Sequence, residues 1–203
     1  ETEACGNGLI CFSKYMVGNG LIKGHEMKIE TLSGVRTAWA EGKKIRVSMG
    51  LPQFAPDEVP VTIDVKPILD YPITVAGREL KLNILSLGNP HAVLFINGSV
   101  AQFPLFEFGP AVENHPIFPQ RTNFEVANVI SRSEIQARVW ERGVGETLSC
   151  GTGACAIAVA ARLHNYIDNK VDIMMLGGTL SVDWDGEGEV YLSGPAEVVF
   201  EGE

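Results

Sequence analysis

The chain has 203 residues, of which 45% are hydrophobic and 20% are charged, as is ordinary for a globular protein with a buried core. Its net charge of −9 and the lack of a lysine or arginine cluster argue against a nucleic-acid partner. No apolar run approaches the length of a membrane span, so we expect no membrane partner either.

The four cysteines fall into two pairs, Cys5 with Cys11 and Cys150 with Cys155. Neither spacing is the C-x2-C that structural zinc sites prefer, and so few cysteines do not suggest a disulfide framework. We therefore expect no metal site. Cys11 and Cys155 lie within apolar helical stretches, and we expect both thiols to be buried and inert.

The first predicted element is a helix that follows Cys5-Gly6-Asn7-Gly8. Apolar residues recur along 9–16, and Gly18-Asn19-Gly20 is a typical helix end. Next, residues 35–39 and 44–48 alternate around a glycine turn and predict a β-hairpin.

The middle of the chain predicts a crossover and more strands. Residues 52–72 are punctuated by prolines and are expected to connect two halves. Residues 81–96 predict two strands around a tight Gly88-Asn89-Pro90 turn, and residues 136–142 predict a strand that ends at Glu141 and Arg142.

A glycine-rich stretch, 141–156, then combines an acid, a guanidinium group and a thiol. It runs into a segment, 154–163, that is apolar almost all round and therefore predicts a buried helix. Residues 179–184 and 189–192 predict a second hairpin around Asp185-Gly186-Glu187-Gly188.

These elements repeat. Cys5-Gly6-Asn7-Gly8 recurs 145 residues later as Cys150-Gly151-Thr152-Gly153, and Leu32-Ser33-Gly34 recurs at nearly the same offset as Leu176-Gly177-Gly178. Ser48 and its neighbours recur loosely at Ser193. Matches in one order at one offset indicate a duplicated unit, whose halves pack about a pseudo-twofold axis so that equivalent loops face each other.

The repeat also predicts a gap. About sixty to seventy residues precede the second C-G-x-G loop within its own copy, a plausible span for half a domain, whereas four residues precede the first. We therefore expect the opening strands of the first half to be absent.

A C-G-x-G loop at a helix start suits anion binding. Its glycines allow backbone N–H groups to approach a carboxylate, and the positive end of the helix is expected to lower the thiol pKa from about 8.5. Two thiols on opposite faces of one carbon suit racemisation, because one removes the α-proton and the other returns a proton. No lysine lies in a recognisable Schiff-base setting, so no pyridoxal cofactor is implied.

Four segments together resemble the diaminopimelate epimerase family: A-C-G-N-G at 4–8, G-N-P-H at 88–91, R-T-N at 121–123 and E-R-G-x-G-E-T-x-x-C-G-T-G-A-C-A at 141–156. The last string is highly specific, and the resemblance extends over nearly the whole chain. It implies a cofactor-independent isomerase that interconverts LL- and meso-diaminopimelate on the route to lysine and peptidoglycan.

The resemblance implies an α+β fold of two pseudo-symmetric halves, each a curved, mostly antiparallel β-sheet wrapped around a central helix. Residues 1–50 would be the remainder of the N-terminal half, and 51–203 the C-terminal half with the crossover, whose last residues can return to the first half. The implied partner is a small molecule, diaminopimelate. A homodimer and a cytoplasmic location, unless a targeting peptide precedes the chain, are further expectations.

By the same resemblance, Cys5 and Cys150 would be the catalytic pair, with donor and acceptor roles that exchange with the direction of reaction. The carboxylate at the reacting centre would be bound by the backbone N–H groups of Gly6, Asn7, Gly151 and Thr152.

Arg142 would clamp the distal carboxylate with its bidentate guanidinium group. Asn89 and Asn123 would add hydrogen bonds at that non-reacting centre. Glu141 would hold a substrate ammonium group and, together with His91, would tune the pKa values of the two thiols. Glu146 is expected to order the loop.

Two alternatives stay open. A proline racemase-like enzyme also uses two thiols, but that family lacks the Glu141-Arg142 element, and a substrate with one carboxylate would leave Arg142 without a second carboxylate to bind. The chain could also be a non-catalytic fragment, because the family's opening segment contributes asparagines that have no counterpart here.

Overall fold

The computed structural model describes residues 5–32 and 34–199 of the chain. Ser33, part of the repeated Leu-Ser-Gly segment, lies outside them. The helices are α1 (Gly6–Gly18), the short 3-10 helix η1 (Val100–Gln102), α2 (Leu105–Glu113) and α3 (Gly151–Leu163). The strands are β1 (Glu26–Thr31), β2 (Gly34–Glu41), β3 (Lys44–Gly50), β4 (Ile68–Val75), β5 (Arg78–Ser86), β6 (Pro90–Phe95), β7 (Asn123–Ser131), β8 (Glu134–Glu141), β9 (Gly145–Thr147), β10 (Lys170–Met175), β11 (Gly178–Asp183) and β12 (Val190–Pro195).

The predicted hairpins are confirmed. β2 pairs with β3, β5 with β6 and β11 with β12, in each case antiparallel. The turn between β5 and β6 needs Gly88, whose φ of +90° lies in the left-handed region that favours glycine. β8 ends at Glu141, as the alternation of 136–142 predicts, so Arg142 begins the loop that follows.

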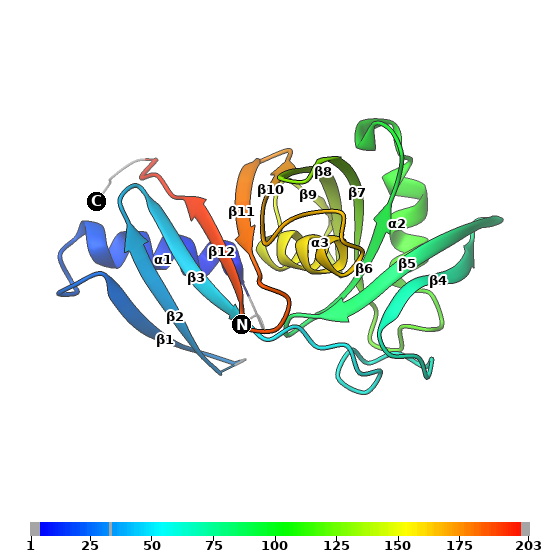
Figure 1. The fold of residues 1–203 in the computed structure, drawn as a ribbon, viewed down its shortest axis with the longest axis horizontal. Coiled ribbons are helices and arrows are strands. Elements are labelled where there is room, and N and C mark those ends of the chain that lie inside the picture. Colours follow the sequence, from blue (N-terminus) through cyan, green and yellow to red (C-terminus); the bar gives the residue numbers. More distant parts are fainter. Residues whose placement is uncertain (1–4, 33, 200–203) are drawn as a thin grey trace.

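The duplicated unit is visible in the order of elements. Each C-G-x-G loop leads into a helix and then three strands, α1-β1-β2-β3 in one half and α3-β10-β11-β12 in the other. The two halves meet where β12 pairs antiparallel with β3, with Leu192 opposite Val47, and this pair joins all the described strands into one sheet (Figure 1). Most pairings are antiparallel, and the parallel ones join β6 to β7 and β8 to β10. The predicted α+β class with two pseudo-symmetric halves is confirmed.

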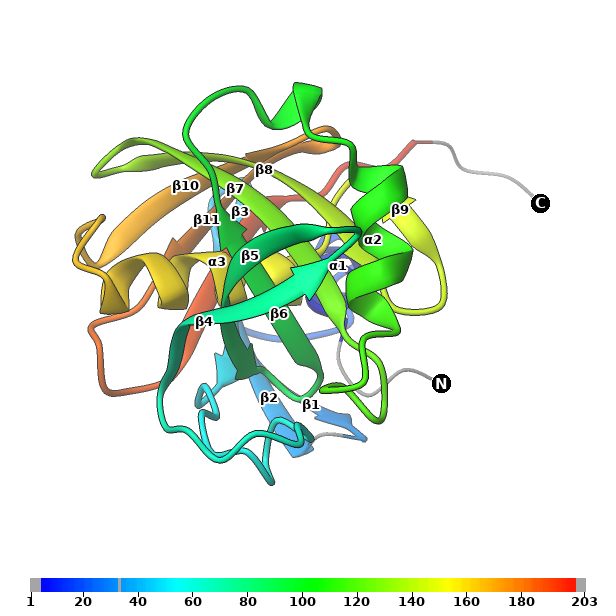
Figure 2. The ribbon, with the colours of Figure 1, turned by 90° about the vertical axis from the view of Figure 1, so that its right-hand side faces the viewer.

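The two central helices differ in burial. Every residue of α3 from Gly151 to Ala161 is buried, because β5, β6, β7 and β10 to β12 curve around it (Figure 2). The alanine-rich sequence suits this position, since small side chains let strands approach from all sides. In contrast, α1 packs against β2, β3 and β12 and leaves Tyr15 59% exposed.

This difference corrects one prediction. Cys155 is buried within α3 as expected, but Cys11 is exposed. Its side chain lies one helical turn before Tyr15 and so shares the open face of α1. Apolar composition alone therefore did not reveal which side of this helix faces the sheet.

Among the described residues, no helix is long and apolar enough to cross a membrane.

Candidate active site

The N-terminal ends of α1 and α3 touch at two glycines. A Cβ atom added to Gly151 would lie 3.0 Å from the Cα atom of Gly6 and 3.3 Å from the backbone nitrogen of Asn7. Leu192 of β12 packs against both glycines. The Asn7 side-chain nitrogen donates to the carbonyl oxygen of Ser149 (3.2 Å), which ties the first loop to the second. The repeated loops therefore face each other across the seam, as the repeat predicts.

Both cysteines occupy the N-cap position. Each has an extended backbone and a sulfur that accepts a hydrogen bond from the glycine three residues on: Gly8 N to Cys5 Sγ at 3.3 Å and Gly153 N to Cys150 Sγ at 3.4 Å. The first N–H groups of an α-helix have no partner within that helix, and two helix starts lie side by side here. This is the arrangement that a bound carboxylate needs.

The electrostatic setting of Cys150 differs from expectation. Cys150 is only 6% exposed, and its pKa is raised to about 12, chiefly by burial. The negative charge of Glu141 contributes to this rise, whereas hydrogen bonds from Thr152 and from the Gly153 N–H group oppose it. The prediction of a lowered thiol pKa is therefore wrong for Cys150, because desolvation of the thiolate outweighs the helix end.

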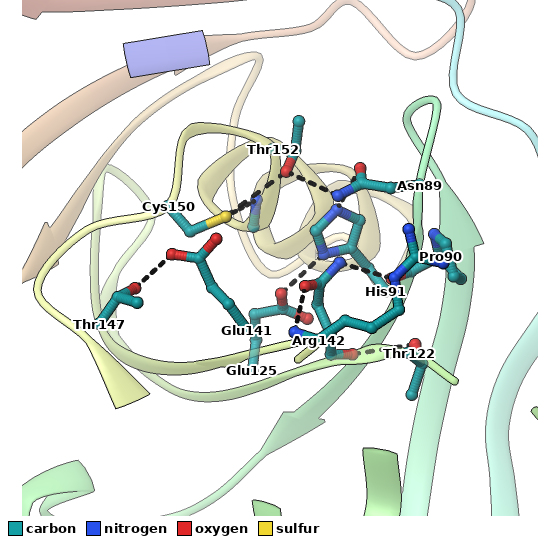
Figure 3. Close-up of polar contacts among 12 residues, drawn as sticks. Asn89, Pro90, His91, Thr122, Glu125, Glu141, Arg142, Thr147, Cys150 and Thr152 are labelled. Carbon is teal, nitrogen blue, oxygen red and sulfur yellow. Dashed lines mark hydrogen bonds and ion pairs between the residues drawn. The ribbon is translucent and has the colours of Figure 1, made fainter. Parts of the chain in front are cut away.

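Cys150 begins a continuous row of polar side chains (Figure 3). The Cys150 sulfur lies 3.4 Å from Thr152 Oγ1, to which Asn89 Nδ2 donates at 3.4 Å. Asn89 Oδ1 lies 3.0 Å from His91 Nε2, and His91 Nδ1 lies 2.7 Å from Glu125 Oε1. Four of these five residues, all but Glu125, are sequence-predicted site residues, which the structure brings together.

The β5–β6 turn and the parallel β6–β7 pair position the asparagines. His91 of β6 lies opposite Asn123 of β7. Asn123 Nδ2 donates to the Pro90 carbonyl oxygen (2.9 Å), and Asn123 Oδ1 accepts from the Arg142 backbone N–H group (2.9 Å). Asn123 is 3% exposed and thus ties the β6 entry to the loop that carries Arg142. A contact of its amide with a substrate stays a prediction.

A tight hairpin of β8 and β9 presents Glu141 and Arg142. Gly143 adopts a φ of +76° at the turn, which explains the glycine there. The Glu141 carboxylate accepts a short hydrogen bond from Thr147 Oγ1 and lies beside the Cys150 sulfur (Figure 3). Arg142 Nη1 donates to the carbonyl oxygen of Gln120 (3.2 Å).

Sequence reasoning missed two residues that hold this hairpin. Glu113, at the end of α2, accepts hydrogen bonds from the Gly143 N–H group (2.8 Å) and from Trp140 Nε1 (2.8 Å). Arg138 of β8 donates to both carboxylate oxygens of Glu146 (2.7 and 3.0 Å), which agrees with the predicted ordering role of Glu146. Neither Glu113 nor Arg138 belongs to a sequence motif by which it could have been found.

Glu125 is the third residue that was missed. It is fully buried, and burial raises the pKa of its carboxyl group, while the neighbouring His91 opposes that rise. In sequence it lies two positions after Asn123 on the same strand, hence on the same face. That spacing was the available signal.

Among residues 5–32 and 34–199 no cluster of three or more His, Cys, Asp or Glu residues could hold a metal ion.

Comparison with known proteins agrees with this geometry. The family model described as diaminopimelate epimerase matches residues 84–199. Proteins of that name from Acetivibrio thermocellus, Moorella thermoacetica and Stutzerimonas stutzeri are 41%, 43% and 44% identical over this whole chain, which covers 74%, 75% and 74% of their lengths. The chain belongs to the diaminopimelate epimerase family.

More distant solved structures share the fold of this diaminopimelate epimerase family member. A hydroxyproline epimerase from Agrobacterium vitis has a TM-score of 0.69 at 14% identity, and the match covers 95% of this chain and 64% of that one. A phenazine biosynthesis protein of the PhzF family from Enterococcus faecalis has a TM-score of 0.65 at 15% identity, with 98% and 72% covered. At such identities the likeness is to the fold alone.

Proposed function

We propose that this chain carries the two-thiol site of a diaminopimelate epimerase and interconverts LL- and meso-diaminopimelate without a cofactor. The observation that carries this proposal is the contact of two C-G-x-G helix starts at Gly6 and Gly151, each capped by a cysteine. Such a pair can hold one carboxylate between two positive helix ends and present a thiol to each face of the neighbouring carbon.

In the proposed reaction, one cysteine thiolate takes the α-proton and becomes a thiol, and the electron pair of the broken C–H bond stays on carbon. The helix N-termini stabilise the negative charge that spreads into the substrate carboxylate. The opposite thiol then gives its proton to the other face of the carbon and becomes a thiolate. No proton is gained or lost overall, so the roles of Cys5 and Cys150 exchange with direction.

The surroundings of Cys150 support an assignment of its resting state. Cys150 is buried and its pKa is raised to about 12, so we propose that it rests as the thiol. When Cys150 acts in the reverse direction, its high pKa makes its thiolate a strong base, which suits a carbon acid as weak as an amino-acid α-hydrogen.

The distal half of the substrate fits the other elements. Arg142 suits a second carboxylate, because a guanidinium group binds it through two parallel hydrogen bonds. Glu141 suits an ammonium group. A proline racemase-like reaction remains the second candidate, and its monocarboxylate substrate would leave Arg142 without that partner. The division of the chain at residue 50, the homodimer and the cytoplasmic location stay proposals.

The test is exchange of substrate α-hydrogen in heavy water. Cys5→Ser and Cys150→Ser are each expected to abolish epimerisation of diaminopimelate, and any remaining exchange should depend on which diastereomer is supplied. Unchanged epimerisation in either variant would refute the two-base mechanism. Turnover of proline in place of diaminopimelate would favour the second candidate, and no turnover of either by the unaltered chain would mark it as a non-catalytic fragment.

A further inference from the structure

In the polar row that ends at Glu125, the donor and the acceptor of each hydrogen bond can be assigned. Thr152 Oγ1 accepts the N–H group of Asn89, so its own hydroxyl hydrogen must point elsewhere. The Cys150 sulfur is the neighbour within reach, at 3.4 Å. When Cys150 is a thiolate it carries no hydrogen, so Thr152 then donates to the sulfur. Since Gly153 N donates to the same atom, the thiolate sulfur accepts two hydrogen bonds.

The same logic fixes the protons at the other end. Asn89 uses its amide nitrogen toward Thr152 and turns its oxygen toward His91 Nε2. An oxygen acceptor 3.0 Å away requires Nε2 to carry a hydrogen. On the other side of the ring, Nδ1 and Glu125 Oε1 lie 2.7 Å apart, a distance at which two lone pairs cannot face each other. One more proton must lie between them.

Counting these protons makes the His91–Glu125 pair neutral. Whether the shared proton is drawn on oxygen or on nitrogen, the pair carries no net charge. The environment of Glu125 agrees: its Oε2 atom is buried and has no hydrogen-bond partner among the described residues, which disfavours a carboxylate anion. The first turn of α3 also packs tightly on this group, because a Cβ atom on Gly153 would lie 2.9 Å from Glu125 Oε1.

We propose that Glu125 is a positioning residue that shares one proton with His91, and that this neutral pair orients Asn89 and Thr152 so that they donate toward Cys150 and stabilise its thiolate. Glu125 acts only through His91 and the two side chains that follow. The inference rests on the proposed function for its purpose, since a thiol that exchanges protons with substrate needs its thiolate to be accessible.

The arrangement answers a specific problem at this site. Burial and the negative charge of Glu141 both disfavour the Cys150 thiolate. An anionic Glu125 adds a second negative charge close to the sulfur and is one of the causes that raise the pKa of Cys150. Neutralising Glu125 with a shared proton removes that penalty, and directing the row toward the sulfur supplies a donor in its place.

The test measures thiolate formation without turnover. Iodoacetamide reacts with thiolates, so at pH 8.5 the alkylation rate of Cys150 follows its thiolate fraction, and Cys5 in the same molecule is the internal reference. Site-resolved mass spectrometry separates the two. Thr152→Val keeps the shape but removes the hydroxyl donor, and we expect Cys150 to react about tenfold more slowly relative to Cys5, the effect of one hydrogen bond to a charged group. Thr152→Ser restores the donor and should restore the rate to within about twofold.

A second matched pair tests Glu125. Glu125→Gln keeps a neutral group whose amide can donate to Nδ1, and should leave the Cys150 rate within about twofold of the parent. Glu125→Leu removes the hydrogen-bond partner of His91 Nδ1, so His91 no longer orients Asn89 and Thr152 toward the sulfur. The alkylation rate of Cys150 should then fall severalfold. A faster reaction in Glu125→Gln would overturn the neutral pair, because it would mean that a negative charge had been removed. An unchanged or faster reaction in Thr152→Val would overturn the direction of the row.

A measurement on the unaltered chain covers the case in which a buried variant does not fold. In nitrogen-15 NMR, His91 Nε2 should carry a hydrogen at neutral pH, and an unprotonated Nε2 would overturn the proposal. These readouts stand apart from activity. If the unaltered chain does not exchange substrate hydrogen but the variants show the expected Cys150 alkylation rates, the proposed function alone is refuted. If the unaltered chain exchanges substrate hydrogen but the variants alkylate Cys150 at the parent rate, this inference alone is refuted.

Discussion

The two C-G-x-G loops share sequence, backbone and capping bond, yet their surroundings are different. Cys5 is exposed at the start of a helix that a few strands cover on one side, whereas Cys150 is buried at the start of a helix enclosed by strands from several directions. Within residues 5–32 and 34–199, the row of Asn89, His91 and Glu125 reaches the second loop and not the first. A duplicated scaffold therefore supplies two similar anion-binding helix starts, and the strands around each one set how deeply its thiol is buried.

The largest expected difference between the two loops is in the alkylation rates of their thiols. A thiol with a pKa of about 12 is a thiolate in only about one molecule in 10⁴ at pH 8, and Cys150 is buried as well. We expect iodoacetamide to modify the exposed Cys5 and Cys11 at least about a thousandfold faster than Cys150 in the native chain. Quantitative mass spectrometry over time measures the rates. Unfolding in urea should bring all the rates together, and comparable native rates would refute the contrast in burial.

The helices that follow the loops should differ in their contribution to stability. Ile157 of α3 is fully buried, so Ile157→Ala should lower the free energy of unfolding by about 2–5 kcal/mol. The matched control is Tyr15→Ala on the open face of α1, which should change it by no more than about 0.5 kcal/mol. Urea denaturation followed by circular dichroism measures both. Equal losses would mean that α1 is covered as completely as α3.

Where the loops touch, the two glycines should also respond unequally. At both glycines the closest neighbour of an added Cβ atom is the flexible end of Leu192, but the backbone of the facing loop lies 3.0 Å from a Cβ on Gly151 and 3.3 Å from one on Gly6. Gly151→Ala should separate the helix starts and lower substrate hydrogen exchange about 100-fold, the loss that a misplacement of about 1 Å can cause. Gly6→Ala should lose less, since the Leu192 and Met49 side chains can move and the facing backbone is farther away. A larger loss in Gly6→Ala would contradict this account of the seam.

The sequence predicted most of this comparison, but not its asymmetry. The repeated C-G-x-G loops, their helices and the hairpins follow from local signals, and the repeat alone predicts that the loops face each other. The exposure of Cys11 and the raised pKa of Cys150 depend on which strands pack against each helix, and that is decided by contacts between distant segments. Glu125 was missed for the same reason: it becomes part of the site only when β6 and β7 lie side by side.

The smallest expected effect is on stability at alkaline pH, where the buried thiols of α3 should matter. Burial raises the pKa of Cys155, and the neighbouring Cys150 adds to that rise. Above the ordinary thiol value of 9.0, the unfolded chain therefore releases this proton while the folded chain keeps it, and stability falls as pH rises. The fall should be about 1.4 kcal/mol per pH unit for each such thiol, beginning near pH 9.

Replacing that thiol should flatten the alkaline fall by this amount. Urea denaturation of Cys155→Ala between pH 9 and 11 is expected to show a slope smaller by about 1.4 kcal/mol per pH unit than that of the parent chain. Cys11→Ala, on the open face of α1, is the matched control and should keep the parent slope. The slope, not the absolute stability, is the quantity to compare, because the small cavity left in α3 lowers stability equally at every pH. If both variants keep the parent slope, the Cys155 thiol does not hold its proton in the folded chain, and the enclosure of α3 is looser than its burial indicates.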